Sequence, residues 1–82
     1  MIESTDPLTI DLSIILPTLN EVESVPVTLS VLEELLQGVA FELIVVDDDS
    51  SDGTWQKVLK ISRNDNKIRL VRRVHRLSLI HI

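Results

Sequence analysis

The sequence predicts an α/β fold with a parallel sheet, built in the order β-α-β-α-β. Two short apolar runs, at residues 12–17 and 41–46, have the length and composition of strands. The segment between them repeats apolar residues at helical spacing, and a second helix and a third strand follow after Gly53. Strands that alternate with helices form right-handed parallel crossovers, which build one half of a doubly wound, Rossmann-like sheet.

The first strand and the first helix are marked by proline and glycine. The run "LSIILP" fits a buried strand whose hydrogen-bonded ladder stops at Pro17. Apolar residues then recur at spacings of four, three and four, at Val25, Leu29, Leu32 and Leu36. This spacing places them on one face of a helix. We expect that helix to begin near Ser24, to hold Pro26 in its first turn and to end at Gly38.

The second strand, the second helix and the third strand follow in order. The stretch "ELIVV" is rich in β-branched residues, which suits a strand buried on both faces, as in a parallel sheet. Asp52 fits the N-cap of the second helix, and Gly53 allows the tight turn before it. The buried face of that helix is expected to hold Trp55, Val58, Leu59 and Ser62. "RNDN" ends the helix, and the alternating run "KIRLVRR" predicts a third strand nearer an edge than the second.

Composition excludes several classes of function. The 82 residues have a formal net charge of −5, whereas proteins that bind a phosphate backbone need a basic face. No nucleic-acid partner is therefore expected. Four arginines occur late, at positions 69, 72, 73 and 76, and a solvated strand face explains them most simply. The chain contains no cysteine, which excludes disulfides and thiolate metal sites.

The two ends of the chain are expected to lie outside the fold. Residues 1–11 have acids but neither a basic region nor a long apolar one, so they predict a flexible lead-in rather than a secretory signal. The longest apolar runs fall far below the roughly 20 residues of a membrane helix. The last six residues, "LSLIHI" at 77–82, match the translation of a transposon end used to prepare sequencing libraries, which predicts an artefactual tail. On this interpretation His81 is not a natural ligand, and His75 is a lone, solvated imidazole.

Three adjacent carboxylates follow the second strand directly. Two like charges about 4 Å apart repel by about 4 kcal/mol at an effective dielectric constant of about 20. Asp47, Asp48 and Asp49 therefore require hydrogen-bond donors, a cation or open water. In open α/β sheets the carboxyl ends of the strands border the crevice where ligands bind. The three acids are thus expected to lie in a binding site.

Two stretches together indicate a family: "PTLNE" at residues 17–21, after the first strand, and "DDDSSDGT" at residues 47–54, after the second. Separated by one helix, they resemble the nucleotide-sugar half of the family 2 glycosyltransferases, which have the GT-A fold. The stretch "DDDSSDGTW" is most similar to the dolichyl-phosphate mannosyltransferase-like branch. The resemblance covers residues 12–76 and implies the N-terminal part of a GT-A nucleotide-sugar-binding domain, truncated after its third strand.

The resemblance implies that the nucleotide-sugar-binding residues are Pro17, Leu19, Glu21, Asp47 and Asp48. The proline would contact the base and ribose through the backbone. Asp48 would accept a hydrogen bond from a base N–H, supported by Asp47, because an ionised carboxylate only accepts. Glu21 would accept from the nucleoside. Leu19 stands where the family usually has tyrosine, so apolar contact replaces ring stacking; Asp49 stands where many members have glycine or asparagine, although the mannosyltransferase-like branch accepts aspartate.

The same resemblance implies a reaction for the parent protein. It would transfer a hexose from a nucleoside diphosphate sugar, of the GDP-mannose or UDP-glucose class, to a polyprenyl phosphate or related acceptor, with inversion by direct displacement. A Mg²⁺ or Mn²⁺ ion is expected on the diphosphate, since a hard cation neutralises that leaving group. No residue of this chain matches the family's metal ligands or catalytic base, so residues 1–82 alone are expected to be inactive. Many relatives act in the cytoplasm, at the cytoplasmic face of a membrane.

Two alternatives remain open from the sequence. "ELIVVDDDS" also resembles the opening strand of a receiver-type phosphoacceptor signalling domain, whose acid pair holds a magnesium ion. That interpretation needs a phosphoacceptor aspartate after a later apolar strand, and only Asp65 remains, in the polar "RNDN" turn. The other alternative is a non-catalytic nucleotide-binding half-domain. The resemblance also implies that strands encoded beyond Ile82 flank the first strand, which leaves an exposed apolar edge in residues 1–82. We therefore expect the isolated chain to be marginally stable or prone to aggregate.

Overall fold

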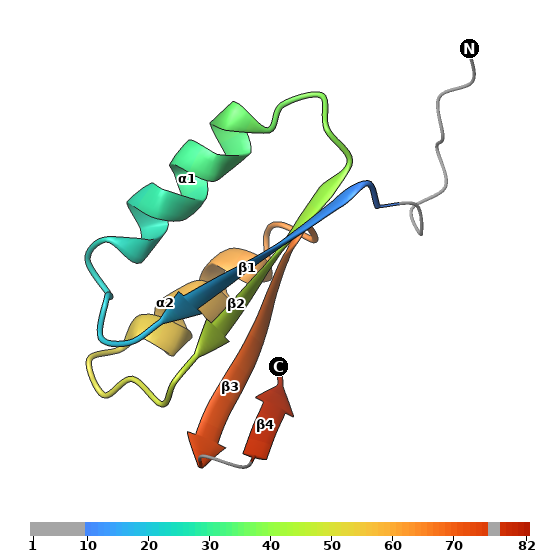
Figure 1. The fold of residues 1–82 in the computed structure, drawn as a ribbon. Helices are drawn as coiled ribbons and strands as arrows, with labels where there is room; N and C mark the ends of the chain where they lie inside the picture. Colours follow the sequence, from blue (N-terminus) through green and yellow to red (C-terminus); the bar gives the residue numbers. More distant parts are fainter. Residues whose placement is uncertain (1–9, 76–77) are drawn as a thin grey trace.

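The computed structural model describes residues 10–75 and 78–82 as a small α/β unit (Figure 1). Its elements are β1 (Leu12–Thr18), α1 (Val25–Leu35), β2 (Phe41–Asp47), α2 (Thr54–Ser62), β3 (Ile68–His75) and β4 (Ser78–His81). The first five confirm the predicted β-α-β-α-β order. Residues 1–9 of the expected lead-in, with Arg76 and Leu77, lie outside the described residues, and so do the side chains of His75 and His81.

The sheet brings the ends of its first three strands to one place. The strand order is β1-β2-β3-β4, in which β1 and β3 both pair parallel with β2 and β4 pairs antiparallel with β3. In this register Thr18 of β1 lies beside Asp47 of β2, and Asp47 lies beside Arg72 of β3. The carboxyl ends of the three parallel strands therefore form one edge, as an open α/β sheet requires of a ligand site.

The first helix begins where the sequence predicts but ends at Leu35, ahead of the expected end at Gly38. It begins at Val25 after the N-cap residue Ser24, and Pro26 occupies the first turn, where no backbone donor is needed. Val25 and Leu29 are buried, and Gly38 follows the helix with a φ of 84°. A left-handed φ is accessible to glycine without steric strain, so the chain reverses there toward β2.

The second helix begins one residue later than predicted. Its N-cap is Gly53, with a φ of 97°, and not Asp52. Glycine takes this position because the sharp turn out of the preceding loop requires a left-handed backbone. The Asp52 carboxylate nevertheless accepts a hydrogen bond from the Thr54 N–H at 3.0 Å. Asp52 thus stabilises the start of the helix from the position before the cap, by the interaction expected of a cap.

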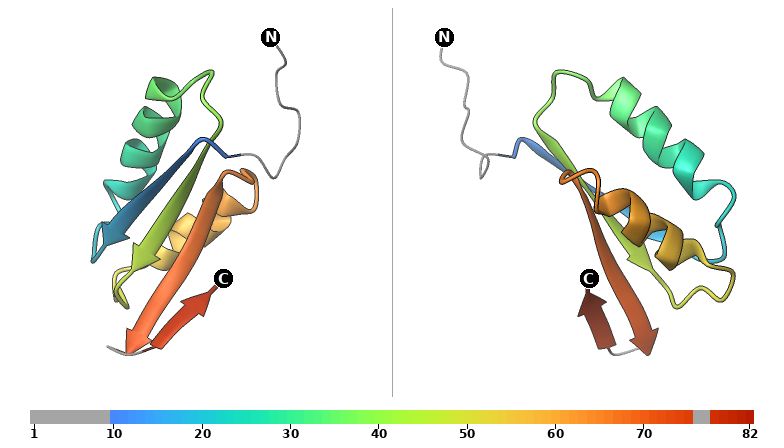
Figure 2. Two further views of the ribbon diagram at one scale, coloured as in Figure 1. Left: turned by 45° about the vertical axis from the view of Figure 1, so that its right-hand side comes forward. Right: turned by 180° about the vertical axis from the view of Figure 1, so that it is seen from behind.

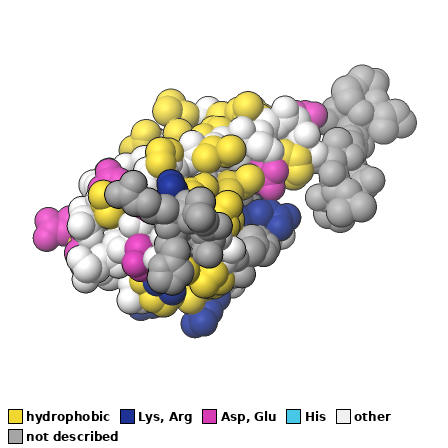
Figure 3. Space-filling view, turned by 60° about the horizontal axis from the view of Figure 1, so that its bottom comes forward, with side chains coloured by type: hydrophobic (Ala, Val, Ile, Leu, Met, Phe, Trp, Pro, Cys, Tyr) yellow, Lys and Arg dark blue, Asp and Glu magenta, His cyan; other side chains and the backbone are white. Residues whose placement is uncertain are grey.

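Both helices lie on the same face of the sheet, which Figure 2 shows from two sides. Phe41, Leu43 and Val45 of β2 are buried beneath them, whereas Ile44 and Val46, on the opposite face, are only half-buried. The prediction of a second strand buried on both faces is therefore wrong for the described residues. Two right-handed crossovers that step in the same direction along a sheet place their helices on one side. The space-filling view shows hydrophobic side chains spread over much of the visible surface (Figure 3).

The first strand has the expected open edge, but its side chains are less buried than predicted. Among the described residues β1 lies at the edge of the sheet, and Ile15 at its centre is 65% exposed. Pro17 suits this position, because an edge strand tolerates a missing backbone donor. β3 was expected nearer an edge than β2, yet it has a neighbour on each side. The reason is β4, which pairs with β3.

Strand β4 occupies a segment for which the sequence predicts no element. Leu79 lies beside Arg73 and Ile80 beside Arg72, and the register shifts between Arg73 and His75. A short apolar segment next to an open strand gains backbone hydrogen bonds by pairing with it, whatever its origin. The artefactual origin of residues 77–82 therefore stays a prediction. Among the described helices, neither has the length and apolar character needed to cross a membrane.

Replacement of Leu43 by alanine tests the one-sided core. Leu43 is completely buried under the helices, so Leu43→Ala should lower the free energy of unfolding by about 2–5 kcal/mol. Leu79→Ala removes the same atoms from a side chain that is 66% exposed. It should change the free energy of unfolding by about 0.5 kcal/mol or less. Urea denaturation followed by circular dichroism measures both. Equal effects would contradict the assignment of the core.

Candidate functional site

Polar side chains gather where β1, β2 and β3 end. Two segments leave this edge: the β1–α1 loop (residues 19–24) and the β2–α2 loop (residues 48–53). All three neighbouring acids, Asp47, Asp48 and Asp49, lie here, as the sequence predicts for residues at the end of β2. The structure separates them sharply by burial: Asp47 is completely buried, whereas Asp48 and Asp49 are exposed.

Asp47 is surrounded by hydrogen-bond donors. Its Oδ1 accepts from the Thr18 hydroxyl at 2.8 Å and from the Ser50 hydroxyl at 2.7 Å, and its Oδ2 accepts from the Ser50 N–H at 2.8 Å. Three donors and no acceptor match a carboxylate, which offers only lone pairs. The side chain thereby joins the end of β1, the end of β2 and the β2–α2 loop.

The two loops are also joined directly through Asn20. Its N–H donates to the Ser50 hydroxyl at 2.8 Å, and its side-chain oxygen accepts from the Ser51 N–H at 2.9 Å. Asn20 has a φ of 51°, in the left-handed region that asparagine tolerates better than most residues. A side chain that fits this backbone and reaches across both loops explains why asparagine suits the position.

A second pair of contacts joins the loops nearer the helices. The Glu21 N–H donates to the Thr54 hydroxyl at 2.8 Å, and the Val22 N–H donates to Oδ2 of Asp52 at 3.1 Å. The Thr54 hydroxyl in turn donates to Asp52. This hydroxyl contact, together with the N–H groups of Val22 and Thr54, holds the pKa of Asp52 below its ordinary value of 3.8. The starts of α1 and α2 are therefore fixed to each other.

The two exposed acids face arginines of β3. Asp49 accepts from Arg72 at 3.2 Å, and Oδ1 of Asp48 lies 3.9 Å from Nε of Arg73. The Arg72 guanidinium also stacks on the Trp55 ring, 3.8 Å from its centroid, and only 19% of its side chain is exposed. The prediction of a solvated arginine face is therefore wrong for Arg72. Trp55 is half-buried against the core, as expected, and supports a cation–π contact in addition.

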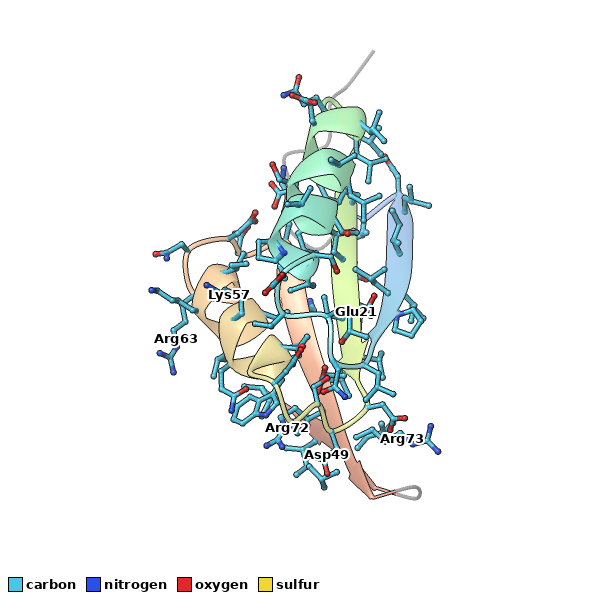
Figure 4. The ribbon with its side chains drawn as sticks, turned by 90° about the vertical axis from the view of Figure 1, so that its left-hand side faces the viewer. Glu21, Asp49, Lys57, Arg63, Arg72 and Arg73 are labelled. Carbon is cyan, nitrogen blue, oxygen red and sulfur yellow. The ribbon has the colours of Figure 1, made fainter. Side chains whose placement is uncertain are left out.

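The predicted nucleotide-sugar residues lie at this same end of the sheet. Pro17 and Leu19 are exposed, and Oε1 of Glu21 accepts from the Leu19 N–H at 3.2 Å. Figure 4 shows Glu21 near the start of α1, with Asp49, Arg72 and Arg73 at the strand ends. A cavity of about 100 Å³ is lined by Leu16, Pro17, Thr18, Glu21, Ser24, Val25 and Thr28. Ligand pockets usually hold about 300–1,000 Å³, so this cavity alone does not enclose a nucleotide sugar.

Five residues of the site are not found by the sequence reasoning: Thr18, Asn20, Ser50, Arg72 and Arg73. Ser50 had a local signal, because a serine three residues after an acid commonly bonds back to it. The arginines had none, since their pairing with the acids depends on the register between β2 and β3. Nε of Arg72 is buried and has no hydrogen-bond partner among the described residues.

The acids present do not fit a divalent cation. Within residues 10–75 and 78–82, no group of three or more His, Cys, Asp or Glu side chains is placed to hold a metal ion. The oxygens of Asp47 are occupied by internal donors, and Asp48 and Asp49 lie beside guanidinium groups. A hard cation requires six or more oxygen ligands, including water. The described residues therefore do not supply a metal centre.

A parallel α/β sheet with polar loops at its strand ends defines the chain as part of an α/β ligand-binding domain. The family model for glycosyl transferase family 2 matches residues 13–80. Over 67 residues, 82% of this chain, the sequence is 39% identical to a dolichol-phosphate mannosyltransferase of Pyrococcus furiosus. The chain belongs to glycosyl transferase family 2. It spans 19% of the length of that relative.

Replacement of Asp47 by asparagine tests its central position. Both carboxylate oxygens accept hydrogen bonds, whereas the amide replaces one of them with an NH₂ group that faces a donor. Asp47→Asn should therefore lower the free energy of unfolding by about 1.5–3 kcal/mol. Asp48→Asn makes the same chemical change in a side chain that is 58% exposed. It should change the free energy of unfolding by about 0.5 kcal/mol or less. Urea denaturation measures both changes. An Asp47→Asn variant as stable as the wild type would contradict the central position of Asp47.

The lowered pKa of Asp52 makes stability dependent on pH. A carboxyl group whose pKa is lowered on folding stabilises the fold fully above its unfolded value, here about 3.8. This contribution is lost as the pH falls through the folded pKa. Asp52→Asn should therefore be less stable than the wild type at neutral pH, and the two should converge at acid pH. Thermal denaturation over a pH series checks this, and a difference that is independent of pH would contradict it.

Proposed function

We propose that the protein to which this chain belongs transfers a hexose from a nucleoside diphosphate sugar to a polyprenyl phosphate or related lipid acceptor. The main support is the family match, which extends across the strand-end site formed by Asp47, Asp48 and the β1–α1 loop. The donor belongs to the GDP-mannose or UDP-glucose class. The receiver-type alternative has no support from the family match, while a non-catalytic nucleotide-binding half-domain is distinguished by the experiment below.

In this proposal the exposed and buried acids have different tasks. Asp48, at the solvent-exposed end of β2, accepts a hydrogen bond from an N–H of the base. Asp47 supports it indirectly, because its three internal hydrogen bonds fix the start of the loop that holds Asp48. Glu21 accepts from the nucleoside, while Pro17 and Leu19 provide backbone and apolar contacts. The small cavity at this end supports a site that needs further residues to enclose its ligand.

The remainder of the reaction depends on groups beyond those described. Hexosyl transfer with inversion requires an acceptor oxygen to displace the nucleoside diphosphate directly at the anomeric carbon. A Mg²⁺ or Mn²⁺ ion on the diphosphate stays part of the proposal, and its ligands would come from other residues of the protein. A lipid-phosphate acceptor would place the reaction at a membrane, and we propose its cytoplasmic face because the family resemblance suggests it. We also propose that residues 1–82 alone transfer no sugar.

Asp48→Asn in the full-length protein tests the proposed base contact. Loss of a hydrogen bond to a charged acceptor costs about 1.5–3 kcal/mol, so kcat/KM for the donor should fall roughly 10- to 150-fold. Asp49→Asn, the matched neighbour with similar exposure, should have a smaller effect. The assay supplies radiolabelled GDP-mannose or UDP-glucose with a polyprenyl phosphate and measures label in the lipid phase.

The outcomes of this assay separate the alternatives. Transfer by the full-length wild type with a selective loss in Asp48→Asn supports the proposal. Nucleotide binding by the full-length protein without transfer to any acceptor would instead identify a non-catalytic binding protein. Sugar transfer by residues 1–82 alone would contradict the proposed inactivity of this segment.

A further inference from the structure

Arg72 ends a row of buried side chains on β3. Ile68 and Leu70 are buried beneath the helices, and Arg72 is the next residue on the same face, because side chains alternate between the faces of a strand. Its neighbour on β2 in this register is Asp47. A charged side chain therefore occupies a position that the pattern of the strand assigns to the core.

Arg72 differs from the two arginines on the other face of β3. Only 19% of its side chain is exposed, against 54% for Arg69 and 42% for Arg73. Arg69 lies 3.1 Å from Glu42 in an ordinary surface ion pair, which contributes little to stability. Burial of a charged group is costly unless its surroundings compensate for the lost water. The contacts of Arg72 therefore indicate why an arginine occupies this position.

Two contacts hold the Arg72 guanidinium in place. Its central carbon lies 3.8 Å from the centre of the Trp55 ring, in the first turn of α2. Its Nη2 donates to Oδ1 of Asp49 at 3.2 Å, and Figure 4 shows both residues at the strand ends. Arginine suits this arrangement, because its planar group stacks on a ring and donates hydrogen bonds from its edge at the same time. Arg72 thus connects the end of β3, the start of α2 and the β2–α2 loop.

Asp49 is the residue at which the β2–α2 loop turns. Its φ of 56° lies in the left-handed region, which few residues other than glycine, asparagine and aspartate adopt. On one side the loop is fixed to β1 and β2, since the Asp48 N–H donates to the Thr18 carbonyl and Ser50 donates to Asp47. The contact between Asp49 and Arg72 adds a connection to β3 on the other side.

We propose that Arg72 is a positioning residue for donor binding: it holds Asp49, and through Asp49 the backbone that presents the Asp48 carboxylate to the base. This inference rests on the proposed function, in which Asp48 accepts a hydrogen bond from the base. Asp48 and Asp49 are adjacent, so a change in the backbone angles of Asp49 redirects the carboxylate of Asp48. Weaker binding of a group remote from the reacting carbon raises KM and leaves kcat unchanged.

Arg72→Met in the full-length protein tests this role. Methionine keeps an unbranched apolar side chain beside the Trp55 ring but removes the guanidinium. KM for radiolabelled GDP-mannose or UDP-glucose should rise about 3- to 10-fold, the effect of one ordinary hydrogen bond. The value of kcat should stay within about 2-fold. Arg69→Met, the matched control on the same strand, should leave KM unchanged. A KM of Arg72→Met equal to that of the wild type would overturn the proposal.

A double variant shows whether Arg72 acts through Asp49. Asp49→Asn removes the charge that Arg72 contacts, while asparagine still tolerates the left-handed backbone. KM of the Asp49→Asn, Arg72→Met double variant should match that of the weaker-binding single variant, because the two changes break one interaction. An increase equal to the product of the two single effects would overturn the proposal, since Arg72 would then contact the donor itself.

Hydrogen–deuterium exchange measures the position of the loop without any activity. Peptides that cover residues 48–53 of the full-length protein should exchange about 3-fold faster or more in Arg72→Met, and at the wild-type rate in Arg69→Met. Circular dichroism verifies that Arg72→Met is folded. If it is not, Asp49→Asn decides both measurements, because it changes an exposed side chain of the same pair. Unchanged exchange would overturn the proposal.

The outcomes separate this inference from the proposed function. Transfer by the wild type, with KM unchanged in Arg72→Met, would overturn the role of Arg72 alone. If the wild type binds the nucleotide sugar without transfer, its dissociation constant replaces KM and the same increase is expected. A wild type that neither transfers sugar nor binds a nucleotide would overturn the proposed function, and this inference with it.

Discussion

The structure of this end of the molecule depends on the buried carboxylate of Asp47. A buried carboxylate is tolerated only where donors surround it, and three donors from Thr18 and Ser50 do so here. Thr18 belongs to β1, the strand beside β2, and Ser50 belongs to the loop that follows β2. Asp47 therefore sets where β1 ends relative to β2 and where the β2–α2 loop begins. The positions of the exposed polar groups follow from this one interaction.

The same interaction resolves the crowding of three acids. Like charges at close range repel by several kcal/mol in a protein environment, so a row of three aspartates needs separate environments. Asp47 turns inward to hydroxyl and amide donors, and the left-handed backbone at Asp49, with a φ of 56°, changes the direction of the chain. Asp48 and Asp49 then lie near different arginines on β3. Each acid thus has its own compensating partners, and two remain accessible to a ligand.

Local pattern was sufficient to predict the first five elements, β1 to β3 with both helices, but not their surroundings. The spacing of Val25 and Leu29, with Pro26 and Gly38 as boundary signals, determined α1, because these signals act within one helix. Local pattern alone predicted a buried first strand, and the exposed edge of that strand was expected only from the family resemblance, since burial of a strand depends on which neighbours are present; Ile15 is 65% exposed. The pairing of Arg72 with Asp49 depends on strand register across 23 residues, which composition does not encode. Strand β4 forms by pairing with an available edge and carries no strong signal of its own.

The site is well defined although the sheet around it is covered on one face only. Its order comes from hydrogen bonds between the β1–α1 and β2–α2 loops, through Asn20, Glu21 and Val22, and these bonds do not require a second helical layer. The uncovered face, by contrast, combines exposed or half-buried apolar residues such as Ile15 and Ile44 with the polar contacts of Ser13 and Arg69 to Glu42. The polar end of the molecule is therefore specified by contacts within residues 10–75, because side chains and backbone groups of the β1–α1 and β2–α2 loops bond to one another.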